Sequence, residues 1–521
     1  MSGRVYLVGA GPGDPGLLTV RAARLLAAAD VVVTDHLVPA ALLAGVRPDA
    51  LVIEVGRPHG EGPRLPQRDV ESLLIEHARA GRRVVRLKSG DPMLFGRGGE
   101  EGAALHAAGV SFEIVPGVSS ATAAPAYAGI PLTHRDHASL VTIATGRQAS
   151  DADGAALPAL PWAQLASQGG TLVFLMAMRQ LAPLLDTLMR HGLPAERPAA
   201  VVQHGTLARQ RTLVATAGTL AAEAAAAELG SPAVVVIGDV VSLRAQVAWV
   251  ERRPLAGRVV LVTRPRHQAA AFSERLEAYG AEVLAVPTIV LEPPADPTAL
   301  ERAVAEAGSY DWIVFTSTNG VRTFFERLAA QQRDVRELGS TRIAAIGAET
   351  ARALEALLLR PALVPDDYRA EGLLAAFGGE PMAGRRVLLP RAAGARAVLR
   401  TELERLGARV DDVATYRARR PAPAEAAPLL AALDEQRVDA VAFTSSSTAR
   451  NFAELAGPTR LAAIAASGRP LIASIGPVTS DTVRACGLGV GVEAQPYTTA
   501  ALATALARHF CNAEVDPVLP C

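Results

Sequence analysis

At residues 86–101 the chain reads Arg86-Leu-Lys-Ser-Gly-Asp-Pro-Met-Leu-Phe-Gly-Arg-Gly-Gly-Glu-Glu101. An apolar run at 84–87 predicts a strand, and the glycine-rich, charged residues after it predict a loop that leads into a helix. Within this loop Ser89-Gly90 allows a sharp turn, Asp91 can accept a hydrogen bond from a ribose or an ammonium group, and Pro92 stiffens the backbone. A strand that ends in so dense a loop indicates a ligand-binding edge of an α/β sheet.

Short apolar runs alternate with longer helical patterns through most of the chain, which is typical of α/β units around a largely parallel sheet. We expect two sets of strands in the first half, separated at the turn Pro116-Gly117, and the pattern restarts at Arg258-Val-Val-Leu-Val-Thr263. The expected strands of the first set are 5–8, 31–34, 52–55, 84–87 and 112–115, and those of the second set are 141–145, 171–174, 200–203 and 233–237.

The second half contains an internal repeat. The segment Phe315-Thr-Ser-Thr-Asn-Gly-Val-Arg-Thr-Phe-Phe-Glu326 returns as Phe443-Thr-Ser-Ser-Ser-Thr-Ala-Arg-Asn-Phe-Ala-Glu454. Two further pairs match in the same order and at nearly the same offset: 343–347 with 472–476, and 276–283 with 403–410. Three ordered matches at one offset indicate a duplicated unit, so we expect two similar lobes with a cleft between them.

The bulk composition excludes several classes of protein. Among the 521 residues, Lys+Arg and Asp+Glu both number 52, so nothing global indicates a nucleic-acid or anionic-membrane surface, and an anionic substrate would need local basic clusters. We expect no signal peptide, and no stretch has 18 uncharged apolar residues, so we also expect no transmembrane helix. Three cysteines (Cys486, Cys511 and Cys521) are too few for a disulfide framework or a zinc site, and we expect a cytoplasmic protein.

Three more loops of the first half follow expected strands. Gly9-Ala-Gly-Pro-Gly-Asp14 is either a tight turn or a ligand loop, and Asp14 in the third glycine position argues against a bound pyrophosphate. In Val115-Pro-Gly-Val-Ser-Ser120, Ser119 or Ser120 either caps a helix or binds a ligand. The fourth loop, Gly129-Ile-Pro-Leu-Thr-His-Arg-Asp136, is polar and basic. Together the loops predict a pocket at one edge of the sheet.

Residues 4 to about 244 resemble the uroporphyrinogen-III methyltransferases, which have the tetrapyrrole methylase fold. The resemblance implies S-adenosylmethionine (SAM) as methyl donor and two methylations of uroporphyrinogen III, at C2 and C7, that give precorrin-2. It also implies a homodimer. The segments that carry it are Val8-Gly-Ala-Gly-Pro-Gly-Asp-Pro-Gly-Leu-Leu-Thr19, Asp35-His-Leu-Val38, Leu65-Pro-Gln67, the 88–101 run and Tyr127-Ala-Gly-Ile-Pro-Leu-Thr-His-Arg-Asp136.

By position in these motifs the resemblance implies that Asp35 is the base that removes a proton from the ring system. Because the substrate bears eight carboxylates, four basic residues are plausible anchors for it: Arg57, Lys88, Arg97 and Arg135. The implied SAM contacts are Pro12, Ser89, Gly90, Asp91, Leu94, Ser119, Ser120, Met176 and Gly205.

The sequence departs from the family pattern in three places. The usual Gly-Lys-Arg after the third strand is Gly56-Arg57-Pro58, the following loop is one residue longer, and Ser89 replaces a frequent glycine. The first change puts a lysine-specific role at position 57 in doubt. Charge is kept there, so we expect activity to survive.

Residues 257–510 resemble the uroporphyrinogen-III synthases. The resemblance implies two α/β lobes joined by linkers near 287–294 and 415–423, and cofactor-free closure of hydroxymethylbilane with inversion of ring D. It matches Tyr416 to a tyrosine that assists loss of the hydroxyl group, and Ser317, Thr318, Ser445 and Thr479 are expected to hold carboxylates or to cap helices. The motifs are Val260-Leu-Val-Thr-Arg-Pro265, Tyr310-Asp-Trp-Ile-Val-Phe-Thr-Ser-Thr-Asn-Gly-Val321, Ala345-Ile-Gly347, Phe443-Thr-Ser-Ser446 and Ile475-Gly-Pro-Val-Thr479.

We therefore predict a two-enzyme fusion without metal, NAD, nucleic-acid or membrane partners. Alternatives for the first half are a methylase for a later precorrin of the cobalamin pathway and a dehydrogenase built on residues 9–14, and the second half is otherwise a non-catalytic scaffold. Whether the product serves sirohaem or cobalamin is left open. The predicted divisions are 1–248 (subdomains about 1–116 and 117–248), a linker at 249–256, 257–510 and a tail at 511–521.

Overall fold

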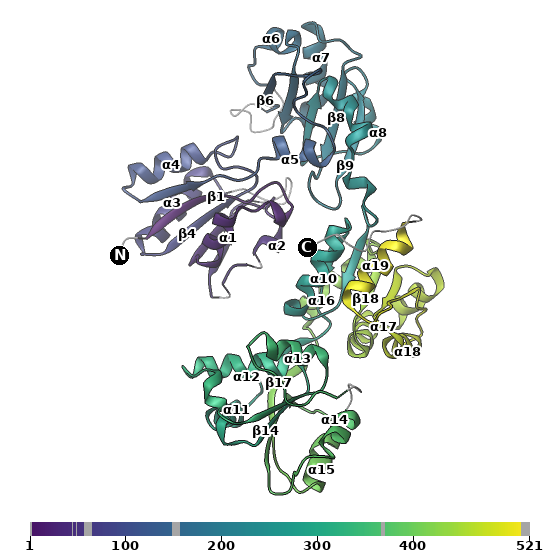
Figure 1. The fold of residues 1–521 in the computed structure, drawn as a ribbon. Helices are drawn as coiled ribbons and strands as arrows, with labels where there is room; N and C mark the ends of the chain where they lie inside the picture. The colour runs from purple at the N-terminus through teal and green to yellow at the C-terminus, as the bar shows by residue number, and fades with distance from the viewer. Residues whose placement is uncertain are drawn as a thin grey trace. The chain divides into compact units, whose positions relative to one another are not determined.

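A computed structural model describes residues 3–43, 45–47, 49–56, 65–147, 157–365 and 370–511. The chain forms two compact units, one built mainly from the residues up to Val259 and the other mainly from Leu284–Ala505. Each unit contains two five-stranded sheets with helices on their faces (Figure 1). No helix among these residues is long and apolar enough to cross a membrane.

The first sheet has the order β3-β2-β4-β1-β5, and its pairings are parallel, as the alternation of strands and helices predicts. Its valine-rich central strands are buried on both faces, by α1 and α2 on one side and by α3 and α4 on the other. The elements are β1 (Arg4–Gly9), η1 (Pro15–Leu17), α1 (Val20–Ala27), β2 (Val31–Thr34), α2 (Ala40–Leu43), β3 (Leu51–Glu54), α3 (Gln67–Arg79), β4 (Arg83–Lys88), α4 (Gly98–Ala107) and β5 (Phe112–Val115).

The second sheet has the order β6-β7-β10-β8-β9, and only β6 and β7 pair in parallel. The expectation of a largely parallel sheet is wrong here, and β9, an edge strand on which Val214 is exposed, was not among the expected strands. The elements are α5 (Ser120–Tyr127), β6 (Val141–Thr145), α6 (Trp162–Ser167), β7 (Thr171–Leu175), η2 (Met178–Gln180), α7 (Leu181–Arg190), β8 (Pro198–Gln203), β9 (Arg211–Thr216), α8 (Leu220–Ala226), β10 (Ala233–Ile237), η3 (Asp239–Leu243), α9 (Arg244–Val247) and η4 (Val250–Arg252).

The second half contains sheets of order β12-β11-β18-β19-β20 and β13-β17-β16-β14-β15. Large aromatic side chains fill the lobe cores, among them Phe324 and Phe452. The strands are β11 (Val259–Val262), β12 (Glu282–Ala285), β13 (Val290–Glu292), β14 (Trp312–Phe315), β15 (Arg342–Ala345), β16 (Arg386–Ala392), β17 (Arg409–Arg419), β18 (Ala440–Phe443), β19 (Leu471–Ser474) and β20 (Val492–Glu493). The helices are α10 (Arg266–Ala278), α11 (Thr298–Ala305), η5 (Ala307–Ser309), α12 (Thr318–Ala330), η6 (Val335–Leu338), α13 (Ala348–Glu355), α14 (Ala370–Phe377), α15 (Val398–Arg405), α16 (Pro423–Asp434), α17 (Ser446–Ser467), α18 (Pro477–Ala485) and α19 (Thr499–Phe510).

The two copies of the internal repeat have the same local structure. Ser317 and Ser445 cap α12 and α17, each at φ −163°, with ψ 153° and 156° respectively. Each side chain accepts a hydrogen bond from the N–H three residues later, on Gly320 and Thr448. The repeat in sequence is therefore a repeat in structure, as expected from the three matching segments.

The two expected crossings between the lobes pair with each other. In the first crossing β13 lies antiparallel to the end of β17, with Val290 opposite Arg419 and Glu292 opposite Arg417. The Glu292 carboxylate accepts hydrogen bonds from both arginines. The connections thus form a paired ribbon, where the sequence predicted only two linkers.

The expected linker at 249–256 is packed at both of its ends. Trp249 stacks edge-on against Tyr127 at 5.1 Å between ring centroids, and its Nε1–H donates to the Ala126 carbonyl. Leu255 is fully buried, and its backbone N–H donates to the Tyr279 carbonyl at 2.9 Å. The residues up to Val250 therefore pack on the first half, whereas Leu255 packs on the start of the second.

We expect that cutting the chain between Arg253 and Pro254 gives two soluble, active pieces. A second piece that starts at Gly257 lacks Leu255, whose burial contributes roughly 1.5–3 kcal/mol. The free energy of unfolding of that shorter piece, measured in urea, should be lower by about this amount. Equal stability of the two second pieces, or insoluble pieces from a soluble parent, would contradict the proposed boundary.

Candidate active sites

Four glycines bring together the loops at the carboxyl ends of β1, β4 and β5. Gly11 and Gly90 exchange two backbone hydrogen bonds, of 3.2 and 2.7 Å. A Cβ atom on Gly117 would lie 2.3 Å from the Gly90 carbonyl oxygen and 2.7 Å from the Cα of Gly9. Only glycine allows this approach, so the predicted turn at residues 9–14 forms one surface with the loop at residues 88–97.

Asp91 holds two of these loops together. One carboxylate oxygen accepts the N–H of Met93 at 2.8 Å, and the other accepts the N–H of Gly117 at 3.0 Å. From the sequence, this carboxylate was expected to be able to accept a hydrogen bond from a ribose or an ammonium group. In the structure both of its oxygens bind the backbone, which gives Asp91 a loop-positioning role.

Asp14 joins the first turn to the second subdomain. Its backbone N–H donates to Thr206 Oγ1 at 3.1 Å, and Tyr127 Oη donates to its Oδ2 at 2.7 Å. Burial, and then the hydrogen bond to Asp14, raise the pKa of the Tyr127 hydroxyl. Asp14, which stands where a dinucleotide-binding turn has its third glycine, is thus bound by other protein groups. This argues against a dinucleotide site at the turn.

Residues with strained backbones gather in the loops predicted to bind the methyl donor. Met176 after β7 has φ 58°, and His204 and Thr206 after β8 have φ 49° and 74°. In the β4 loop Phe95 and Arg97 have φ 54° and 60°. A non-glycine residue in this left-handed region costs about 1–3 kcal/mol, and such strain is concentrated at binding and catalytic sites.

The remaining predicted donor contacts lie around α5. Ser119 caps this helix through the N–H of Ala121, and the N atom of Ser120 lies 3.8 Å from where a Cβ on Gly90 would be. A Cβ on Gly205 would lie 2.3 Å from the Ala124 Cβ, so the β8 loop touches the same helix. Three further candidates are half-buried in or beside these loops: Pro12, Ser89 and Leu94.

We expect Gly117→Ala to weaken donor binding, because the added methyl group must push apart the loops after β1, β4 and β5. Overpacking of this kind destabilises by roughly 1–3 kcal/mol, and here the displaced atoms are backbone. Gly99→Ala in α4 is the matched control, since nothing lies within 4 Å of its Cβ position. Isothermal titration with SAM and urea unfolding of both variants check this, and equal affinity in the two variants would refute it.

Asp35 lies just after β2 and belongs to a buried ion cluster. Its carboxylate accepts a 2.6 Å hydrogen bond from Arg86, whose Nε lies 3.1 Å from Glu101 Oε1. Lys88 Nζ donates to the same Glu101 oxygen at 2.8 Å. Arg86 and Glu101 lie at the two ends of the 86–101 run, but no role was expected for either of them. The sequence signal that could have revealed this cluster is the pair of basic residues, Arg86 and Lys88, in and beside an otherwise apolar strand.

The expectation that Lys88 anchors a substrate carboxylate is not supported. Its side chain is 4% exposed and bound to Glu101, and burial lowers the pKa of its amine. The other expected anchors remain predictions. Arg97 is exposed and paired with Glu100, Arg135 is exposed at the tip of a turn, and Arg57 lies outside the described residues.

In the second half Ser317 and Tyr416 meet at one strand end. The Ser317 hydroxyl lies 3.3 Å from Tyr416 Oη, and the same hydroxyl accepts the N–H of Gly320 at 3.0 Å. The backbone carbonyl of Tyr416 accepts the N–H of Ala393 at 2.8 Å, which fixes the tyrosine beside β16. Thr318 occupies the first turn of α12, next to Ser317.

The other lobe presents a similar edge at the ends of β11, β18 and β19. Ser445 caps α17, and the Ser446 hydroxyl donates to the Val478 carbonyl at 3.1 Å, which ties together the loops after β18 and β19. Thr479 is only 5% exposed within α18, so its expected contact with a carboxylate is not supported. Arg264, which the sequence analysis did not assign, follows β11 at this edge, and burial lowers the pKa of its guanidinium group.

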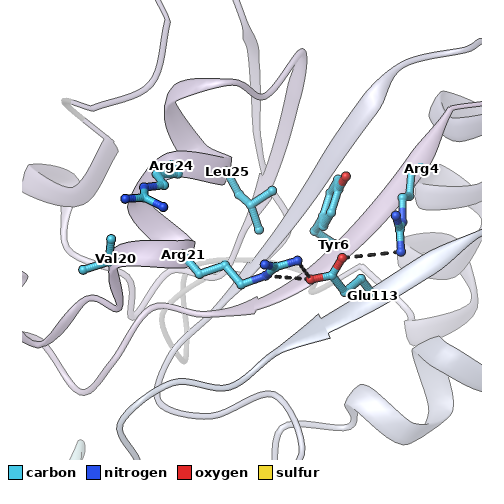
Figure 2. Close-up of a pocket in the computed structure, with 7 residues that line it drawn as sticks. All are labelled: Arg4, Tyr6, Val20, Arg21, Arg24, Leu25 and Glu113. Carbon is cyan, nitrogen blue, oxygen red and sulfur yellow. Dashed lines mark hydrogen bonds and ion pairs between the residues drawn. The ribbon is translucent and has the colours of Figure 1, made fainter.

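A separate pocket of about 480 Å³ lies against α1 and the edge strand β5. Figure 2 shows Arg4 and Arg21 directed at the carboxylate of Glu113. Because its lining comes from the body of β1 and β5 and from α1, the pocket is distinct from the loops at the strand ends. Within the described ranges no group of three or more His, Cys, Asp or Glu side chains is arranged for a metal ion.

Comparison with known proteins supports both resemblances. Residues 4–221 match the tetrapyrrole (corrin/porphyrin) methylases, and residues 270–504 match the uroporphyrinogen-III synthase HemD. The porphyrin biosynthesis protein HemD of Ruminiclostridium josui is 40% identical over 391 residues, which are 75% of this chain and 77% of that protein. The chain belongs to the fused uroporphyrinogen-III C-methyltransferase and synthase family.

Other relatives match this chain over shorter lengths. The uroporphyrinogen-III C-methyltransferase of Bacillus subtilis is 38% identical over 338 residues, 65% of this chain and 68% of that protein. The siroheme synthase of Stutzerimonas stutzeri is 48% identical over 256 residues, so this chain spans about half (54%) of that protein's length. A solved uroporphyrin-III C-methyltransferase from Thermus thermophilus, complexed with S-adenyl homocysteine, is 38% identical over 46% of this chain and 99% of that chain, with a TM-score of 0.40.

Proposed function

We propose that this chain converts hydroxymethylbilane into precorrin-2 in two consecutive activities. The synthase half closes the linear tetrapyrrole with inversion of ring D and releases water, giving uroporphyrinogen III. The methyltransferase half then methylates uroporphyrinogen III at C2 and C7. The observation that carries this proposal is that one chain belongs to both families, and the compound made by the first is the one on which the second acts.

The strand-end loops of the first half fit a SAM molecule. Gly9, Gly90 and Gly117 bring backbone groups to one point, and a Cβ atom on Gly90 would be in ordinary van der Waals contact with the N atom of Ser120, at 3.8 Å. Leu94 packs against the apolar cluster that includes Ala121 and Ala124 of α5, and Met176 after β7 is 47% exposed; both are proposed to contact the donor. When bound, SAM supplies an electrophilic methyl group.

The chain's own residues position the tetrapyrrole and take up a proton. A pyrrole carbon is nucleophilic without activation, so the protein mainly needs to hold it in line with the donor. Each methylation leaves a proton to be removed, and we assign it to the Asp35 carboxylate. Within the described residues Oδ2 of Asp35 accepts no hydrogen bond, whereas Oδ1 is held by Arg86, so one oxygen is open for the proton. Arg97 and Arg135 are exposed and are proposed to bind substrate carboxylates.

In the synthase half we propose that Tyr416 donates its proton to the departing hydroxyl group of hydroxymethylbilane, which leaves as water. Ser317 lies within hydrogen-bonding distance of this phenol and fixes its orientation. The N-termini of α12 and α17, each capped by a serine, present backbone N–H groups that suit substrate carboxylates. Arg264 is proposed as a cationic partner for a carboxylate beside Ser445.

Feeding hydroxymethylbilane and SAM to the full chain tests the proposal. We expect a product with two additional methyl groups, and we expect uroporphyrinogen III when SAM is omitted. Mass spectrometry and isomer-resolving chromatography distinguish these products from the uninverted ring. Formation of only the uninverted isomer would refute the synthase assignment, and failure to methylate added uroporphyrinogen III would refute the methyltransferase assignment.

A further inference from the structure

Four charged side chains form an alternating chain beneath the carboxyl ends of β2 and β4. In order they are Lys88, Glu101, Arg86 and Asp35, joined by contacts of 2.8, 3.1 and 2.6 Å. The side chains of the first three are at most 5% exposed, and that of Asp35 is 29% exposed. The cluster is therefore closed at the Lys88 end and opens to the strand edge only at Asp35.

Every donor of Arg86 that faces the cluster is used. Its Nη2 binds Asp35, its Nε binds Glu101, and its Nη1 lies 3.3 and 3.4 Å from the carbonyls of Val33 and Leu87. This four-way contact leaves the guanidinium group one orientation. The Asp35 carboxylate is consequently positioned by Arg86, and Arg86 is in turn held by its contact with Glu101.

Packing alone does not account for this arrangement. Glu101 is 0% exposed, and its Oε2 has no hydrogen-bond partner among the residues that the structure describes. A buried carboxylate with an unsatisfied oxygen is costly, and apolar residues of similar volume often replace buried ion pairs without loss of stability. The contact that gives this costly arrangement a possible purpose is the one between Arg86 and Asp35.

We propose that Glu101 is a positioning residue for methyl transfer, which acts through Arg86 to hold the Asp35 carboxylate at the edge of the sheet. Lys88 balances the charge of Glu101 and belongs to the same ion cluster. The inference rests on the proposed role of Asp35 as the base. It adds to that role two residues, Arg86 and Glu101, that need not touch substrate or SAM.

The central experiment measures methyl transfer to uroporphyrinogen III by the full chain carrying Glu101→Gln. Misplacement of a catalytic group by about 1 Å can reduce a rate by about 10², so we expect kcat to fall roughly 10- to 100-fold. KM for uroporphyrinogen III and Kd for SAM should stay unchanged. Asp49→Asn is the matched control, because this exposed carboxylate also pairs with an arginine, Arg47, at 2.8 Å.

Three further variants separate positioning from folding and from binding. If Glu101 acts through Asp35, Glu101→Gln should lower the rate no further in an Asp35→Asn background. Lys88→Gln should lower kcat with KM unchanged, whereas loss of a substrate anchor would raise KM. If the Glu101→Gln protein fails to bind SAM, Arg86→Lys takes its place as the test. Lysine keeps the positive charge but cannot reach both carboxylates, so kcat should fall in the same way.

The results distinguish this inference from the proposed function. A full rate in Asp35→Asn would refute the base itself. A strong loss in Asp35→Asn together with normal kcat in Glu101→Gln would refute only the positioning role. Equal losses from Glu101→Gln in the wild-type and Asp35→Asn backgrounds would likewise overturn it, because the residue would then act independently of Asp35.

Discussion

Asp35→Asn should reduce methyl transfer by roughly 10²–10⁴-fold, the usual contribution of a positioned general base. The amide has nearly the same shape as the carboxylate and can still meet Arg86, but it cannot take up the proton that each methylation releases. SAM affinity should stay nearly unchanged, because the predicted donor contacts come from the loops after β1, β4, β5, β7 and β8. Single-turnover methyl transfer and calorimetric SAM titration measure the two quantities separately.

The second activity of the chain provides an internal control for this variant. Its synthase rate should match that of the parent, so a coupled assay from hydroxymethylbilane should accumulate uroporphyrinogen III in place of the methylated product. Loss of SAM binding together with the rate would make Asp35 a donor-binding or structural residue. If neither changes, the proton goes to water or to another group, and His36 and Arg57 are the next positions to test by substitution.

Tyr416→Phe should lower the synthase rate by roughly 10²-fold, since it removes the hydroxyl proposed to protonate the leaving group. The phenyl ring keeps the packing beside β16, and the carbonyl of residue 416 still accepts the N–H of Ala393. The rate is measured from hydroxymethylbilane, with the isomer ratio as a second readout. Methyl transfer to added uroporphyrinogen III should be unaffected.

Tyr310→Phe is the matched control in the same lobe. Its hydroxyl donates to Asp411 at 2.8 Å, and burial followed by this hydrogen bond raises its pKa, so the group has a structural partner. The control should retain the synthase rate even if its melting temperature falls. Equal rate losses in the two variants, or a full rate in Tyr416→Phe, would remove Tyr416 from the proposed mechanism.

Ser317→Ala should lower the synthase rate by less than Tyr416→Phe does, because it removes only the group that orients the phenol.

Local patterns were sufficient for much of the fold. The expected strands 31–34, 112–115, 141–145 and 233–237 agree with β2, β5, β6 and β10 at both ends. Apolar runs bounded by glycine or polar residues indicate buried strands, and that signal is contained in a few consecutive residues. The exposed edge strand β9 gave a weaker signal, and the sequence did not show that most of the second sheet is antiparallel.

For the candidate active sites, too, some features could be predicted from local sequence and others could not. The sequence by itself determined that glycine-rich loops would follow expected strands, and it left Ser317 and Ser445 as either helix caps or carboxylate ligands. In the structure both serines cap helices, α12 and α17. Which charges pair was decided only by the tertiary structure. Asp35 and Arg86 are 51 positions apart and meet because β2 lies beside β4, and Lys88 is buried because α4 brings Glu101 over the same strand. A charged side chain carries no local sign of its partner, so its role was fixed only when strand order and helix packing brought the two together.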